Sequence, residues 1–441
     1  LNGATYTNTV SSNSVTVTIS AAGLQALTNG STYTLTADIS DAAGNAATQV
    51  TSSSFSVETT VPTISGVSLA ADNSTLIVTM SETVYNTNGG SGSLEVSDFA
   101  LSISGGVASI NTTPSTISSD GNEYTLGLTI SGTPNGSETL TVVPSSSSAI
   151  YDLAGNAAST TQSNNTVSLN DTSPPTLSNV SIVSNNTTNT LAKAGDEITL
   201  TFTASETINE PVVTFQSGSS AITDSSVTYT NTSGNTWTAK YTANASDTDG
   251  SVTYSIAFTD VTNSGTDVTT GSGSVIFDKT LPTVSSFTTT TSSGSYNQAE
   301  EIVITANTTE SVQSGNTITV TLDTSDTVLL SAASTGTTLV GTYTVGADDT
   351  SAGLTVSSFT IGTVADTAGN VMTSTTLPSA GSIFGSKTII IDTAAPNLTQ
   401  VTAITTPSNN TTPSYVFTTD EAGTISTSIS QGLSTSPSAS T

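Results

Sequence analysis

The stretch Asp152-Leu-Ala-Gly-Asn156 decides the fold of this chain, because it recurs along the sequence. Asp41-Ala-Ala-Gly-Asn45 precedes it, Asp366-Thr-Ala-Gly-Asn370 follows it, and a degenerate copy begins at Asp260. The copies are spaced by roughly 110 residues, which suits one β-sandwich domain per repeat. Each copy is typical of a tight turn, since Asp bonds its own backbone and Gly accepts a positive φ.

A second motif, an acid followed by a short polar spacer and a proline, comes about 20 residues after each copy. Proline cannot donate a hydrogen bond into a sheet and stiffens the chain, so we place the domain boundaries at these linkers. The linker acids are Glu58, Asp171, Asp278 and Asp392. The sequence therefore predicts complete repeats at 60–171, 172–278 and 279–392. It also predicts a C-terminal half repeat at 1–59 and the N-terminal part of another at 393–441.

A third motif, Ser-Glu-Thr or a variant of it, ends an apolar run in each repeat. Its acids are Glu82, Glu206 and Glu310, with the pair Asp420 and Glu421 in the last repeat. The apolar residues before it alternate with polar ones, as in Ile198, Leu200 and Phe202. Many short strands with regular turns and no helical period predict an all-β chain of tandem immunoglobulin-like antiparallel β-sandwiches, arranged as an elongated rod.

The composition limits the kinds of catalytic, metal and binding site that the chain can form. The 441 residues contain 33 acids against four lysines, with no Arg, a formal net charge of −29, and neither Cys nor His. This excludes disulfides, Ser-His-Asp triads and the usual zinc ligands, and it disfavours nucleic acid or anionic membrane as a partner. No apolar run approaches the length of a membrane span. No pair of acids has the pattern of a catalytic pair, so we expect no enzyme.

These motifs together resemble the bacterial immunoglobulin-like repeats of giant surface adhesins. The Asp-x-Ala-Gly-Asn turn, the acid-x-x-Pro linker and the Ser-Glu-Thr strand end carry the resemblance over nearly the whole chain. The resemblance implies tandem sandwiches of a secreted, extracellular, cell-surface protein. The repeat at 172–278 departs from the pattern because it lacks Ala-Gly-Asn, which weakens the prediction of a metal site there.

The three motifs should meet in space. Alternate strands of a sandwich reverse direction, so the Ser-Glu-Thr and Asp-x-Ala-Gly-Asn loops should both lie at the end that receives the incoming linker. Converging carboxylates repel one another unless a cation neutralises them, and calcium prefers oxygen ligands. The predicted calcium-binding groups are Glu58, Glu82, Asp152 and Asn156; Asp171, Glu206 and Asp260; Asp278, Glu310, Asp366 and Asn370; and Asp392, Asp420 and Glu421. Metal-free turns and solvated acids remain the alternatives.

The functional hypothesis is a structural stalk or surface filament of an adhesin, stiffened by calcium where one repeat follows another. Its first partners are the neighbouring repeats, with host or surface glycans or proteins bound through other regions. The alternative is that these sandwiches themselves bind a glycan or a protein, which would require exposed aromatic side chains or a large apolar patch. A spacer inside a secreted enzyme is a third reading, which the flanking sequence would decide.

Overall fold

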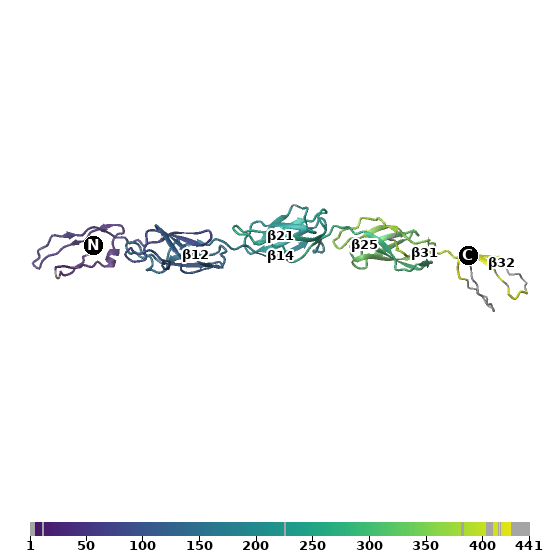
Figure 1. The fold of residues 1–441 in the computed structure, drawn as a ribbon, viewed down its shortest axis with the longest axis horizontal. Coiled ribbons are helices and arrows are strands. Elements are labelled where there is room, and N and C mark those ends of the chain that lie inside the picture. Colours follow the sequence, from purple (N-terminus) through teal and green to yellow (C-terminus); the bar gives the residue numbers. More distant parts are fainter. Residues whose placement is uncertain are drawn as a thin grey trace. The chain divides into compact units, whose positions relative to one another are not determined.

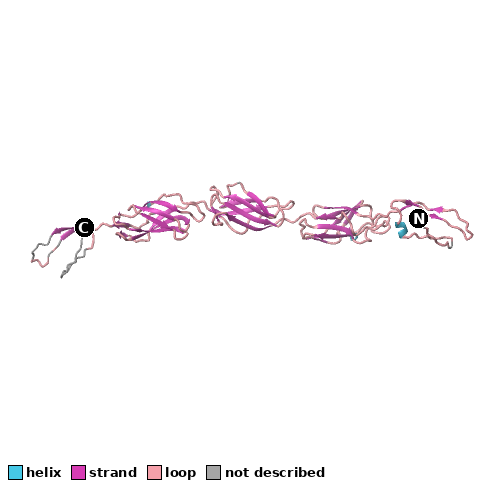
Figure 2. Ribbon diagram, turned by 180° about the vertical axis from the view of Figure 1, so that it is seen from behind, coloured by secondary structure: helices cyan, strands magenta, loops and turns pink. Residues whose placement is uncertain are grey.

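The computed structural model describes residues 5–10, 13–224, 226–380, 383–402, 409–412, 414 and 416–424. It forms two compact units, one of Leu1–Thr176, Glu206–Asn209 and Phe258–Thr266, the other of Leu177–Ser205, Glu210–Ala257 and Asp267–Thr441. Strands and loops make up nearly all of the described chain (Figure 2). No helix in these residues is long and apolar enough to cross a membrane.

Among residues 5–10 and 13–59 of the first unit, the structure has a short helix and two pairs of two-residue strands. Ser20 caps the helix, because its side chain accepts a hydrogen bond from the backbone nitrogen of Gly23. The sequence pattern had given no sign of this helix. The elements are α1 (Ala21–Gln25), β1 (Thr32–Tyr33) paired with β4 (Phe55–Ser56), and β2 (Thr36–Ala37) paired with β3 (Val50–Thr51).

Sandwich 1, which comprises β5 to β13, packs two sheets around one core. Every second residue of β6 and β12 is buried, so Leu76, Val78, Leu140 and Val142 share that core. Burying one such side chain contributes about 1.5–3 kcal/mol. One sheet has the order β5 (Ile64–Leu69), β6 (Thr75–Met80), β10 (Glu123–Gly127), β9 (Ile117–Asp120), and the other β13 (Thr166–Ser168), β12 (Thr139–Pro144), β7 (Phe99–Ser104). A 3-10 helix η1 (Val96–Asp98) precedes β7, and β8 (Ser109–Ile110) pairs with β11 (Ile130–Ser131).

Sandwich 2, which comprises β14 to β22, lies in the second unit and is built in the same way (Figure 1). Burial alternates along all eight residues of β16, as the period of two in the sequence predicts. One sheet has the order β14 (Leu177–Ser184), β16 (Glu197–Ala204), β20 (Thr236–Thr242), β19 (Thr228–Ser233). The other has the order β15 (Leu191–Ala192), β22 (Ile276–Phe277), β21 (Gly250–Ala257), β17 (Val212–Ser217), β18 (Ser220–Ala221).

Sandwich 3, which comprises β23 to β31, follows in the same unit around a core that includes Phe287, Ile304 and Leu339. One sheet has the order β23 (Val284–Thr288), β25 (Glu301–Val312), β28 (Gly336–Thr344), β27 (Thr327–Ser331), β26 (Thr317–Leu322), β30 (Val356–Thr363), and the other β24 (Gly294–Tyr296), β31 (Ile389–Asp392), β29 (Thr350–Ser351). Beyond it β32 (Leu398–Thr402) pairs with β33 (Val416–Thr419). About half of the partial repeat predicted at 393–441, including residues 425–441, lies outside the described residues.

The strand order identifies the sandwich type. In sandwich 2 the first, second, fifth and fourth long strands form one sheet, and the third and sixth pair in the other, which is the immunoglobulin arrangement. The predicted all-β, immunoglobulin-like class is therefore confirmed, with one addition. Two edge pairs, β15 with β22 and β24 with β31, are parallel.

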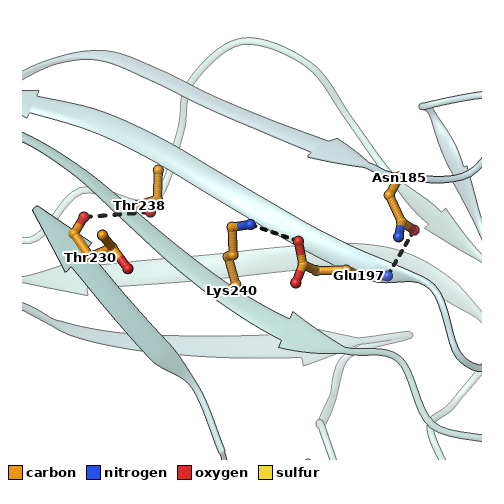
Figure 3. A network of polar contacts seen from close by, with 5 residues as sticks. All are labelled: Asn185, Glu197, Thr230, Thr238 and Lys240. Atoms are coloured by element: carbon orange, nitrogen blue, oxygen red, sulfur yellow. Dashed lines mark hydrogen bonds and ion pairs between the residues drawn. The ribbon is translucent and has the colours of Figure 1, made fainter. Parts of the chain in front are cut away.

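Polar side chains on β16, β19 and β20 of sandwich 2 form a network of contacts (Figure 3). Lys240 on β20 contacts Glu197 on β16 at 2.8 Å between Nζ and Oε1, and both side chains are well exposed. The backbone nitrogen of Glu197 donates to Asn185 Oδ1, and Thr238 donates to the main-chain oxygen of Thr230. Exposed pairs of this kind add little stability, so the core and not this surface holds the sheets together.

Candidate metal centre

The linker acids share one local geometry. In each, a carboxylate oxygen accepts a hydrogen bond from the backbone nitrogen two residues later, a turn that fixes the acid against its own backbone. The pairs are Glu58 with Thr60 at 2.5 Å, Asp171 with Ser173 at 2.8 Å, Asp278 with Thr280 at 2.9 Å, and Asp392 with Ala394 at 3.2 Å.

The Asp of each full repeat motif is held by the Asn at the end of the same motif. Asp366 Oδ1 accepts from the backbone nitrogen of Asn370 and Oδ2 from its side-chain amide, both at 2.9 Å. Asp152 and Asn156 repeat this arrangement at 2.8 and 2.7 Å. Both aspartates are only 1% exposed, so the loop presents a carboxylate that is already fixed in position.

The same Asn residues bind the linker. Asn156 Nδ2 donates to the main-chain oxygen of Glu58 at 3.1 Å, and Asn370 Nδ2 donates to that of Asp278 at 2.9 Å. Their amide nitrogens thus face the acid and the linker backbone. In this geometry the two Asn side chains position the acids, and their own predicted role as metal ligands stays a prediction.

The first convergent cluster consists of Asp171, Glu206 and Asp260, whose carboxylate oxygens lie within 4.8 Å of one another. Glu206 lies just beyond the end of β16, and burial followed by the charges of Asp171 and Asp260 raises its pKa. A cavity of about 380 Å³ adjoins the cluster and is also lined by Thr207, Val261 and Thr262.

The degenerate motif keeps the function of the missing Asn. Asn263, one position earlier than in the full motif, donates from its backbone nitrogen to Asp260 Oδ1 at 2.5 Å. Its side-chain amide approaches Asp260 Oδ2 at 3.3 Å and the main-chain oxygen of Asp171 at 3.5 Å. Sequence reasoning missed this residue, although an Asn within the turn was a usable signal.

The second convergent cluster consists of Asp278, Glu310 and Asp366, again within 4.8 Å. Glu310 was expected to follow a strand end, but it lies inside β25, where the register with β28 shifts between Asn307 and Val312. One of its oxygens, Oε2, is buried without a hydrogen-bond partner. Burial and then the charges of Asp278, Asp366 and Asp249 raise the pKa of Glu310.

Asp249 is a further acid near this cluster that the motifs did not reveal. Its charge also contributes to the raised pKa of Asp278, after burial and the charge of Asp366. Asp249 Oδ1 accepts from the backbone nitrogen of Lys279, which follows the linker acid. It lies just before β21 and belongs to none of the three motifs.

The remaining two predicted groups are less complete. Burial and then the charges of Asp152 and Glu58 raise the pKa of Glu82, so these three acids are near neighbours, although they do not join the clusters within 4.8 Å. Asp420 Oδ1 instead accepts from the backbone nitrogen of Asn397. Among the described residues, Asp392, Asp420 and Glu421 form no such cluster.

The donor set fits a hard cation. Within the described residues the one ion pair joins Lys240 to Glu197, so no lysine neutralises either cluster. Each cluster offers carboxylate oxygens without nitrogen or sulfur ligands, and calcium and magnesium prefer such sites. The unpartnered oxygen of Glu310 is a group that a cation would satisfy.

Comparison with known proteins identifies no family for this chain and finds only low structural similarity. No protein-family profile matches this sequence, and no curated protein is similar to it. Among solved structures, the titin I-band fragment I67–I69 has a TM-score of 0.31 at 9% identity, covering 68% of this chain and 92% of that one. The titin I9–I11 tandem has a TM-score of 0.22 at 10% identity, covering 73% and 93%, and a marsupial T cell receptor 0.24 at 14%, covering 65% and 90%. These likenesses are too low to indicate a function.

Proposed function

We propose that this chain is a structural spacer of a bacterial surface adhesin or filament, with calcium bound where a linker meets the next sandwich. The convergence of Asp278, Glu310 and Asp366 carries the proposal, because their oxygens lie within 4.8 Å and one of them is buried without a partner. Three carboxylates at this separation repel one another strongly in the absence of a cation.

A bound cation would connect three parts of the chain. It would hold the linker acid, the acid beside the second long strand and the Asp of the repeat loop, so the linker could no longer swing freely. Asp278, Glu310 and Asp366 would form one site, Asp171, Glu206 and Asp260 a second, and Glu58, Glu82 and Asp152 a third. Main-chain oxygens and water would complete the roughly six to eight ligands that calcium takes.

The extracellular, cell-surface and bacterial parts of the proposal rest on the resemblance to adhesin repeats. The composition is compatible with it, because a net charge of −29 keeps neighbouring chains apart and soluble. Sandwiches in tandem contact mainly their neighbours, so length is gained repeat by repeat.

A sugar- or protein-binding role for the sandwiches themselves is less well supported. Binding of this kind relies on exposed aromatic side chains that stack on a ligand or fill its pockets. Among the described residues every Phe, Tyr and Trp is buried or only partly exposed, and the exposed large hydrophobic side chains are Val, Leu and Ile. The spacer is therefore the function that the side chains favour.

Calcium titration of the whole chain tests the proposal. We expect calorimetry to show binding, and thermal unfolding in calcium to occur about 10 °C higher than in chelator, since a ligand at about 100 times its Kd adds about 2.7 kcal/mol. Glu310→Gln should remove one site, whereas Glu301→Gln, an exposed acid on the same strand, should not. Equal binding by both variants would refute the assignment of Glu310.

A further inference from the structure

The repeat loop of sandwich 3 is covered, unlike its counterparts. Ala368, in the loop Asp366-Thr-Ala-Gly-Asn370, is 2% exposed. Ala154 and Ala43, at the same position of the motif, are both exposed. The surface that covers Ala368 belongs to sandwich 2 within the same compact unit.

Asn186, in the loop between β14 and β15, makes the contact. Its Nδ2 donates to the main-chain oxygen of Ala368 at 2.9 Å and to Asp196 Oδ2 at 2.7 Å. Its Oδ1 accepts from the backbone nitrogen of Thr188 at 3.0 Å. Every polar atom of this amide is engaged, so the donor is held in place before the next sandwich docks.

Lys193 and Gln313 lie on either side of this contact and support the loop. A β-carbon added to Gly369 would lie 3.5 Å from Cε of Lys193, so the lysine stem packs beside the turn. On the other side Gln313 Nε2 donates to the main-chain oxygen of Asp366 at 2.8 Å, which holds the loop to its own sandwich. A polar cavity of about 430 Å³ lies between Asn186, Thr188, Lys193, Gln313 and Gly369.

We propose that the β14–β15 loop is a docking surface for the 366–370 loop of the following sandwich. The contact fixes this junction without using any carboxylate of the calcium cluster, so it holds whether or not metal is bound. It goes beyond the proposed calcium stiffening and does not depend on it.

The corresponding turn of sandwich 1 is used differently. Asn73, between β5 and β6, donates from Nδ2 to the main-chain oxygen of Asn170 at 2.9 Å and accepts from its backbone nitrogen at 2.9 Å. That Asn holds the end of its own sandwich. The junction after Asp278 therefore has a means of fixation of its own.

Distance measurements between spin labels test this surface. The chain has no Cys, so Thr230→Cys and Thr337→Cys, both exposed, would place one label on sandwich 2 and one on sandwich 3 of the full chain. In chelator we expect the distance distribution to remain as narrow as in calcium. Adding Asn186→Ala should broaden it at least about twofold in chelator, whereas Asn231→Ala, an exposed control, should not.

Two results would overturn the docking surface. The first is that the distance distribution of the parent broadens in chelator as much as that of Asn186→Ala. The second is that the distance distribution of Asn186→Ala stays narrow in chelator. Asp196→Ala, which frees the amide of Asn186, should give the same broadening and serves as the second variant. Thermal unfolding of each variant checks that it is folded, and calcium binding on the same samples tests the proposed metal sites separately.

Discussion

The side-chain amide of Asn370 donates a hydrogen bond of 2.9 Å to the main-chain oxygen of Asp278, a residue 92 positions earlier. The same amide also holds Asp366 at 2.9 Å. One side chain therefore connects the linker to the acid that completes the cluster. Because Asn370 is buried, these bonds have little competition from water.

Replacing Asn370 should weaken both folding and metal binding. We expect Asn370→Ala to lower the stability of sandwich 3 by about 1–3 kcal/mol, because a buried carboxylate oxygen and a carbonyl lose their donor. Calcium affinity at this site should fall by about 10–100-fold, as for other residues that orient ligands. Urea unfolding in chelator and calorimetric titration measure the two effects, with Asn231→Ala as the control. An unchanged affinity would exclude a positioning role.

The effect of Glu310→Gln on folding stability at pH 7 should change sign when calcium is added. Since the pKa of Glu310 is raised above its ordinary 4.5, the metal-free folded state binds the proton more tightly than the unfolded chain. The stability that this carboxyl contributes is therefore present below pH 4.5 and is lost as the pH rises through the raised pKa of the folded state. In chelator the variant should be more stable than the parent at pH 7, with an advantage that shrinks towards pH 4.5. In calcium it should be the less stable protein at pH 7, and urea unfolding that shows no reversal would contradict the site.

Glu138 should stabilise sandwich 1 in the opposite pH range. It is fully buried, and although burial acts to raise its pKa, hydrogen bonds from the backbone nitrogens of Ala108, Val107 and Asn135 outweigh that effect and lower it. Its contribution is therefore present above pH 4.5 and lost as pH falls through the lowered pKa.

The corresponding variant, Glu138→Ala, should cost about 1.5–3 kcal/mol at pH 7, because three backbone donors lose a charged acceptor. Hydrogen exchange of the β12 amides reports the loss. Glu123→Ala, an exposed acid on β10, should leave the exchange unchanged. A similar effect of both substitutions would mean that the buried carboxylate is not the cause.

Replacing a core leucine should cost much more folding stability than replacing a loop leucine. Leu76 is fully buried in sandwich 1, whereas Leu153 in the repeat loop is 69% exposed. Leu76→Ala should cost about 2–5 kcal/mol through lost burial and a cavity, and Leu153→Ala less than about 0.5 kcal/mol. Denaturant unfolding followed by signals from sandwich 1 compares them, and equal costs would place Leu153 in an interface.

The strands were predictable because their information is local. Alternation along Ile198, Leu200 and Phe202 appears directly as alternate burial along β16. The convergence of Asp171, Glu206 and Asp260, and of Asp278, Glu310 and Asp366, was also expected, because strand reversal alone brings these loops to one end. The arrangement of the sandwiches as a rod stays a prediction.

Other features depend on interactions that a motif does not encode. Asn263 acts one position away from the usual place, so a fixed spacing missed it. Asp249 lies outside the motifs and becomes relevant only through tertiary proximity to Asp278 and Glu310. The contact of Asn186 with Ala368 joins residues 182 positions apart, and no sequence period predicts it.

Asn156, Asn263 and Asn370 each approach the main-chain oxygen of a linker acid and not its side chain. Glu58, Asp171 and Asp278 therefore offer the same main-chain acceptor, although one is a glutamate and two are aspartates. A repeat that carries such an Asn can hold either kind of linker acid by the same bond, whereas the contact of Asn186 with Ala368 depends on which sandwich precedes it. If recombination exchanged one repeat for another, the linker bond would therefore survive without a compensating substitution, but the docking contact of Asn186 would not.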